Sequence, residues 1–143
     1  MSGAQDDAIR ELYQETILDH HKRPRNFRTL EGATARASGH NPLCGDRVEV
    51  FVRMDADRIA EVSFQGTGCA ISKASASLMT DSVAGLTRDE AGALFDQFQA
   101  LVTGASDITP EGAAASKLEV FVGVRDYPSR VKCATLAWHA LQA

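Results

Sequence analysis

The spacing of apolar residues predicts an amphipathic helix over about residues 5–21. Side chains suited to the buried face recur there every three or four positions, as on one side of a helix. They are Ile9, Leu12, Tyr13, Thr16 and Ile17. Asp6 and Asp7 stand at its start, where negative charge suits the helix dipole, and Pro24 stops it. The chain from Pro24 to Glu31 is then predicted to be a loop.

Two runs in which apolar and polar residues alternate predict an antiparallel hairpin. The first run covers Arg47 to Arg53 and the second Arg58 to Gln65, with a turn at Met54–Asp57 between them. A period of two places alternate side chains on one buried face. Those side chains belong to Val48, Val50, Val52, Ala60, Val62 and Phe64. A weaker alternation over Gly32–Asn41 predicts a short edge strand before the hairpin.

Helical patterns follow the hairpin. A glycine-rich turn, Gly66–Cys69, leads into a predicted helix over Ala70–Met79, whose Ala and Ser residues indicate close packing against the sheet. Thr87 and Glu90 form a capping box that opens another helix, and Gly104 ends it.

The rest of the chain is predicted to be a loop and a final helix. Ala105–Lys117 contains Pro and Gly and is predicted to be a loop. Leu118–Val124 fits either a strand or a helical face. Helical spacing returns over Ser129–Leu141, so Cys133 is expected in the first turns of the last helix.

Composition narrows the classes of function. The chain has 143 residues, 44% of them hydrophobic, which fits one globular domain over residues 1–143. Its 15 Lys and Arg against 19 Asp and Glu give a formal net charge of −4, so we expect no nucleic-acid partner. The sequence has no apolar run of about 18 residues and starts with acidic residues, so we expect a cytoplasmic protein without a membrane partner.

Three cysteines and one aspartate suggest a metal site. Cys44 and Asp46 flank Gly45 on a turn, Cys69 precedes a predicted helix, and Cys133 lies near the start of another. Zn²⁺ binds thiolate sulfur at about 2.3 Å and carboxylate oxygen at about 2.0–2.2 Å, so these four side chains suit a tetrahedral shell. A helix N-terminus also favours negative charge at Cys69. The residues alone leave two readings open, since unpaired Cys is also a common buried residue and no close C-x-x-C pair is present.

Three motifs resemble those of the U-type iron-sulfur assembly proteins. They are Cys44–Asp46, Phe64–Ser72 and Arg130–Trp138. Leu12–His20 and Pro24–Asn26 also resemble this family, so the likeness covers nearly the whole chain. The resemblance implies an α+β fold, with a small three-stranded antiparallel sheet packed by about five helices. It favours a short helix for the ambiguous stretch before the last helix.

Within the family, the sequence is more similar to the SufU branch than to the IscU branch. IscU proteins carry His directly before the third Cys, where this chain has Lys132, and Thr87–Val102 resembles an extra segment of SufU proteins. Carried over by position, the resemblance implies a zinc site whose ligands are Cys44, Asp46, Cys69 and Cys133. It also implies that Cys44 receives sulfur and that Arg130 lines the site.

The resemblance implies a sulfurtransferase that works with a pyridoxal-phosphate cysteine desulfurase of the SufS type. A thiolate would take the terminal sulfur of the desulfurase's persulfide and pass it towards a downstream iron-sulfur scaffold. Two alternatives stay open at this point. In the first, the protein is an IscU-type scaffold that assembles an iron-sulfur cluster on the same cysteines. In the second, the protein binds zinc for a structural purpose only.

Overall fold

The computed structural model describes residues 15–41, 45–106, 110, 112, 115–126 and 128–142, and it confirms the predicted α+β fold. Residues 15–22 are helical, and the part of the predicted N-terminal helix that precedes them lies outside the described residues. The elements that follow are β1 (Ala35–Asn41), β2 (Asp46–Asp55), β3 (Arg58–Thr67), α2 (Ala70–Val83), α3 (Arg88–Thr103), the 3₁₀ helix η1 (Ala115–Asp126) and α4 (Pro128–Gln142).

The three strands form one antiparallel sheet in the order β1-β2-β3, as the alternating pattern predicts. The turn between β2 and β3 is shorter than expected. Asp55 pairs directly with Arg58, so only Ala56 and Asp57 connect the strands, and Ala56 has a positive φ of 53°. A shift of register between Arg53 and Met54 extends the pairing beyond the alternating run, so the predicted four-residue turn was wrong.

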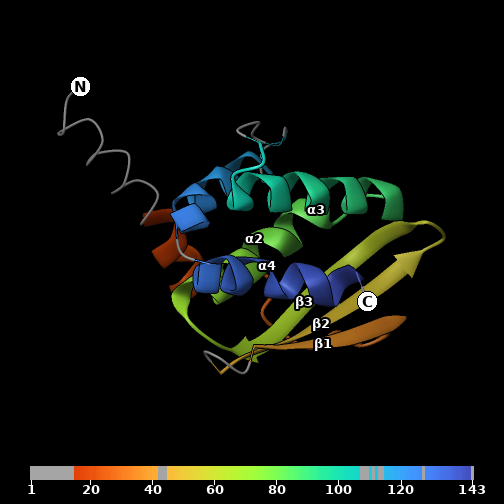
Figure 1. Cartoon of the computed structure of the whole chain (residues 1–143). Coiled ribbons are helices and arrows are strands. Elements are labelled where there is room, and N and C mark those ends of the chain that lie inside the picture. The colour runs from red at the N-terminus through yellow and green to blue at the C-terminus, as the bar shows by residue number, and fades with distance from the viewer. Residues whose placement is uncertain are drawn as a thin grey trace.

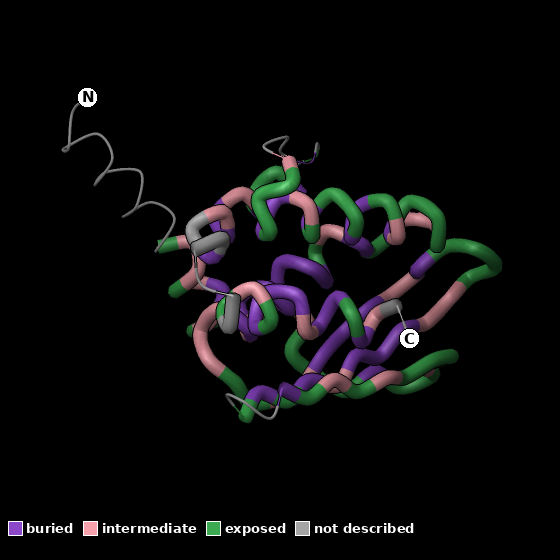
Figure 2. Tube along the Cα trace, viewed as in Figure 1, coloured by how far each residue is buried: buried purple, intermediate pink, exposed green. Residues whose placement is uncertain are grey.

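Helices α2 and α4 cover one face of the sheet, and α3 lies on the far side of these two helices (Figure 1). Figure 2 shows buried positions concentrated where α2 and α4 meet the sheet. The core is largely aromatic on the side of α3. The fully buried Trp138 ring stacks on Phe98 with centroids 4.9 Å apart, and Phe98 meets Phe121 edge-on at 5.8 Å. These contacts tie α4 to α3 and η1.

Local helix signals in the sequence are confirmed. Thr87 and Glu90 cap each other's backbone N–H groups at the start of α3, and Gly104 ends this helix in the left-handed conformation. The ambiguous Leu118–Val124 stretch lies within η1, so it is helical. This helix starts at Ala115, which makes the predicted loop shorter than expected. Among the described residues, no helix combines the length and the apolar character needed to cross a membrane.

Candidate metal centre

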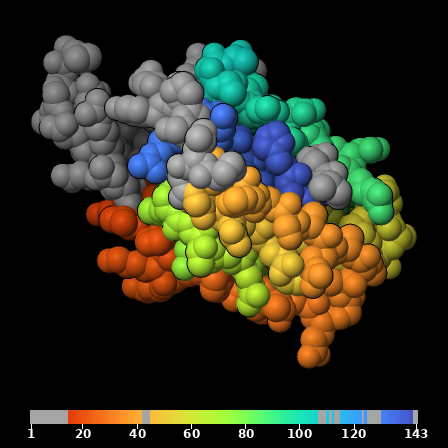
Figure 3. All heavy atoms as spheres, turned by 60° about the horizontal axis from the view of Figure 1, so that its bottom comes forward, coloured from red at the N-terminus to blue at the C-terminus, as the bar shows by residue number. Residues whose placement is uncertain are grey.

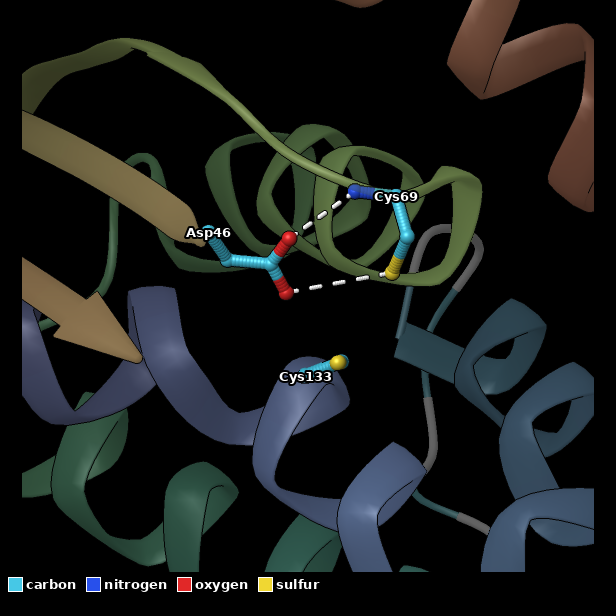
Figure 4. Close-up of side chains that lie close together, drawn as sticks. All are labelled: Asp46, Cys69 and Cys133. Atoms are coloured by element: carbon cyan, nitrogen blue, oxygen red, sulfur yellow. Dashed lines mark hydrogen bonds between the residues drawn. The ribbon is translucent and has the colours of Figure 1, made fainter. Parts of the chain in front are cut away.

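Three separate elements bring Asp46, Cys69 and Cys133 together. Asp46 is the first residue of β2, Cys69 directly precedes α2, and Cys133 lies in the second turn of α4. One potential ligand atom from each of these residues lies within 4.8 Å of the other two. Figure 4 shows the carboxylate and the two thiols converging between the sheet end and the two helices. The predicted proximity of these side chains is therefore present in the described part of the chain.

Cys69 is the N-cap of α2, as the sequence predicts. Its backbone is extended, with φ −69° and ψ 169°, and its Sγ accepts a hydrogen bond from the backbone N of Ser72 at 3.4 Å. The first N–H groups of a helix have no partner within the helix and carry partial positive charge. The thiol of Cys69 is thus placed where a helix start stabilises negative charge.

Asp46 is buried, with 1% of its surface exposed. Its Oδ1 accepts a hydrogen bond from the backbone N of Cys69 at 3.0 Å, and its Oδ2 lies 3.8 Å from the Sγ of the same residue. A buried carboxylate is costly unless hydrogen bonds and opposite charge compensate it. A cation between Asp46 and the two thiols would supply that charge.

A buried polar contact between α2 and α4 holds the helix that carries Cys133. Ser75 Oγ donates to the backbone carbonyl of Ala134 and accepts from Trp138 Nε1 at 3.2 Å. Ser75 and Trp138 are both fully buried. Because Ala134 directly follows Cys133, this contact fixes the stretch of α4 that presents the thiol. The sequence analysis missed Ser75, although the Ala and Ser run of α2 was the signal for close helix packing.

We expect Ser75→Ala to lower the free energy of unfolding by about 1–3 kcal/mol, because the buried Trp138 N–H loses its acceptor. Ser82→Ala is the matched control in α2, since Ser82 donates to the carbonyl of Leu78 one turn earlier in the same helix. Urea unfolding, followed by the fluorescence of the single tryptophan, measures both variants. Equal stabilities for the two variants would contradict the role given to Ser75.

Arg130 and Lys132 add positive charge to the stretch of α4 that carries Cys133. Both side chains are exposed on the first turns of α4. Negative charge on Cys69, and then on Cys133, raises the pKa of the Arg130 guanidinium above its ordinary value. The guanidinium therefore lies within electrostatic reach of both thiols. That Arg130 lines the site stays a prediction.

Cys44 lies outside the described residues, as do its two predecessors. The structure describes the residues on either side, where Asn41 at the end of β1 pairs with Asp46 at the start of β2. Gly45 has φ 72° and donates its N–H to the carbonyl of Asn41 at 2.9 Å. This left-handed conformation costs glycine little, because glycine has no Cβ atom.

The donor atoms suit zinc in type and in spacing. In a tetrahedral zinc shell a sulfur and an oxygen ligand lie about 3.6 Å apart, given the usual bond lengths. The separation of 3.8 Å between Cys69 Sγ and Asp46 Oδ2 is close to that value. Two soft sulfur donors and one carboxylate oxygen are typical of a zinc or iron-sulfur site rather than of magnesium or calcium. The residues present therefore fit the metal that the sequence suggests.

The elements of this centre reach the surface of the molecule on one side. Figure 3 shows the yellow-orange start of β2, the lime-green β3–α2 connection and the blue C-terminal helix on that face. Cys69 is partly exposed, whereas Cys133 and Asp46 are buried. An incoming group can therefore approach Cys69 from solvent, while the other two side chains form the floor of the centre.

Known iron-sulfur assembly proteins are similar to this chain in sequence. The chain is 41% identical over 134 residues to "Iron-sulfur cluster assembly scaffold protein IscU" of Streptococcus pyogenes, covering 94% of this chain and 82% of that protein. It is 36% identical over 131 residues to "Zinc-dependent sulfurtransferase SufU" of Bacillus subtilis, covering 92% and 87%.

A solved structure has the same fold. It is described as a putative iron-sulfur cluster assembly scaffold protein for the SUF system, from Fervidobacterium islandicum, and it superposes with a TM-score of 0.79 at 33% identity. The superposition covers 90% of this chain and 92% of that one. The family described as "NifU-like N terminal domain" matches residues 12–142. The chain therefore belongs to the NifU-like N-terminal domain family of iron-sulfur assembly proteins.

Proposed function

We propose that the protein is a zinc-dependent sulfurtransferase that accepts persulfide sulfur from a cysteine desulfurase for iron-sulfur cluster biogenesis. The observation that carries the proposal is the convergence of Asp46, Cys69 and Cys133 within 4.8 Å. The similarity to the Bacillus subtilis protein, whose name states this activity, supports it. Lys132 also supports this proposal, because proteins of the IscU branch carry His directly before the third Cys.

Four side chains would hold the metal in this proposal. Asp46, Cys69 and Cys133 supply three donors, and Cys44, two residues before Asp46 in the chain, supplies the fourth. When bound, zinc would keep the coordinating thiols deprotonated at neutral pH. The buried positions of Asp46 and Cys133 exclude water from the inner side of the shell.

Cys44 is the proposed sulfur acceptor. Its thiolate attacks the terminal sulfur of the persulfide on the desulfurase, a new S–S bond forms at Cys44, and the S–S bond of the donor breaks. The desulfurase cysteine leaves as a thiolate, so the exchange needs no external oxidant or reductant. Arg130 and Lys132 supply positive charge that favours the anionic thiolate before transfer and the anionic persulfide after it.

The second candidate function is an iron-sulfur scaffold that assembles a cluster on the same cysteines. The name of the Streptococcus pyogenes relative, which is 41% identical to this chain, favours it. The two functions differ in the metal that the thiols hold and in what leaves the site. In the sulfurtransferase, the product is a persulfide handed to a downstream scaffold. In the scaffold, the product is an assembled cluster.

Metal analysis and persulfide mapping together test the proposal. We expect freshly purified protein to hold one zinc per chain, and incubation with a SufS-type desulfurase and cysteine to place a persulfide on Cys44, read by mass spectrometry. Bound iron with the absorption of a cluster would favour the scaffold instead. Zinc without any persulfide would mean that the metal is only structural.

The expected cytoplasmic location of the protein stays a prediction.

A further inference from the structure

The connection between β3 and α2 passes very close to the Asp46 carboxylate at Gly68. A Cβ atom added at Gly68 would lie 2.7 Å from Asp46 Oδ1, 3.1 Å from its Cγ and 3.4 Å from its Cβ. Real Cβ atoms essentially never approach another heavy atom within 3.0 Å. Gly68 does not have the positive φ that would itself favour glycine. Gly68, which has no Cβ atom, therefore leaves the space that the Asp46 carboxylate occupies.

That space determines how Asp46 faces the thiols. With Gly68 in place, Oδ1 accepts from the N–H of Cys69 at 3.0 Å, and Oδ2 lies 3.8 Å from Cys69 Sγ. Carboxylates can bind a metal through one oxygen or through both. Because one oxygen is hydrogen-bonded to the backbone, the carboxylate turns the other towards Cys69. A one-oxygen ligand takes one position of a four-coordinate shell and leaves the other three to further donors.

We propose that Gly68 is a positioning residue of the metal centre, which orients Asp46 as a one-oxygen ligand by leaving room for its carboxylate beside the Cys69 N–H. This inference rests on the metal-binding role proposed above. Gly68 contributes no donor atom, so the likeness of ligand residues between relatives would not reveal its role. In this proposal Gly68 acts on the metal centre only through Asp46, so a variant that lacks the Asp46 carboxylate separates this role from a general effect of Gly68 on the fold.

Gly68→Ala is the direct test. The added methyl group would push the Asp46 carboxylate away from the Cys69 N–H, since the end of this side chain can move more easily than two stretches of backbone. We expect zinc affinity, measured by competition with a chromophoric chelator, to fall about 10- to 100-fold, as is typical when a group that orients a ligand is lost. Gly92→Ala in α3 is the matched control, because a Cβ there meets no atom within 4 Å. Its zinc affinity should equal that of the wild type.

A double-mutant cycle separates positioning from a purely structural role. Asp46→Ala removes the carboxylate that the new methyl group would strike, so adding Gly68→Ala to it should cause no further loss of zinc affinity. If Gly68→Ala alone prevents folding, the same double variant should fold again, because the closest remaining contact is the ordinary one at 3.4 Å. Additive losses in the double variant would overturn the proposal.

A measurement on metal-free protein keeps this test independent of the proposed function. In the wild type, hydrogen exchange at the Cys69 amide should be slowed by its bond to Asp46 Oδ1, and both Gly68→Ala and Asp46→Ala should remove that protection. Unchanged protection in Gly68→Ala would overturn the positioning role. Absence of zinc binding by the wild type would instead overturn the proposed function, and the amide measurement would still decide the role of Gly68.

Discussion

Cys44→Ser is expected to abolish persulfide formation on this protein while leaving its fold largely intact. A serine hydroxyl is not ionised at neutral pH and is a far weaker nucleophile than a thiolate, so the sulfur exchange cannot start. In the sequence, Cys44 stands between the last residue of β1 and the first residue of β2, whereas Cys69 caps a helix and Cys133 is buried in one. We therefore expect that leaving the metal costs least at Cys44, which is why Cys44 is the proposed acceptor.

The matched variants are Cys69→Ser and Cys133→Ser. Both should act mainly by weakening metal binding and lowering stability, since each changes a residue held by a helix. The measurement is persulfide mapping after incubation with a desulfurase and cysteine, together with zinc content and circular dichroism for each variant. A persulfide on Cys69 or Cys133 in zinc-loaded wild-type protein would contradict the assignment of Cys44.

Trp138→Ala should lower the free energy of unfolding by about 3–5 kcal/mol, more than Ser75→Ala or Trp138→Phe. The ring is fully buried, stacks on Phe98 and Phe95, and donates its N–H to Ser75, so truncation leaves both a cavity and an unused acceptor. For a domain of this size such a loss lowers the melting temperature by roughly 10 °C. Because this variant has no tryptophan, circular dichroism is the appropriate probe.

Trp138→Phe is the control that keeps the stacking and removes only the N–H. Its expected loss is about 1–3 kcal/mol, similar to that of Ser75→Ala, because both variants break the same hydrogen bond. Combining Trp138→Phe with Ser75→Ala should cost less than the sum of the two single changes. A loss of less than 1 kcal/mol in Trp138→Ala would show that α4 does not depend on this core contact.

Residues close in sequence gave the predictions that the structure confirms. The hairpin of β2 and β3 follows from the alternation of apolar and polar residues, in which Phe51 is the exception, and the start of α3 follows from a capping box only four residues long. The position of Cys69 before α2 follows in the same way, because the glycines mark a turn and the Ala and Ser residues mark a helix. Each signal acts within a few residues, so the chain carries it without help from distant segments.

Contacts between strands, and between segments that are distant in sequence, decide the features that the sequence predicted wrongly or did not reveal. The turn at Ala56 and Asp57 is short because strand pairing continues past the alternating run, through a shift of register. Local patterns mark the glycine-rich turn Gly66–Cys69 and the Ala and Ser residues of α2, but they do not single out Gly68 or Ser75. Their roles exist only because α4 packs on α2, and because β2 begins beside the β3–α2 connection.

The sequence by itself determined that β2 and β3 form a hairpin, where α2 and α3 start, and which thiol and carboxylate side chains are candidates for binding a metal. The tertiary structure alone decided that Cys133 lies within 4.8 Å of Asp46 and Cys69, residues more than 60 positions earlier in the chain. The physical reason is that α4 is positioned by burial of Trp138 and its neighbours against α2 and α3, and no local pattern encodes where a helix docks. Packing of the core therefore brings the Cys133 thiol to Asp46 and Cys69, and in our proposal Gly68 leaves the space in which the Asp46 carboxylate faces Cys69.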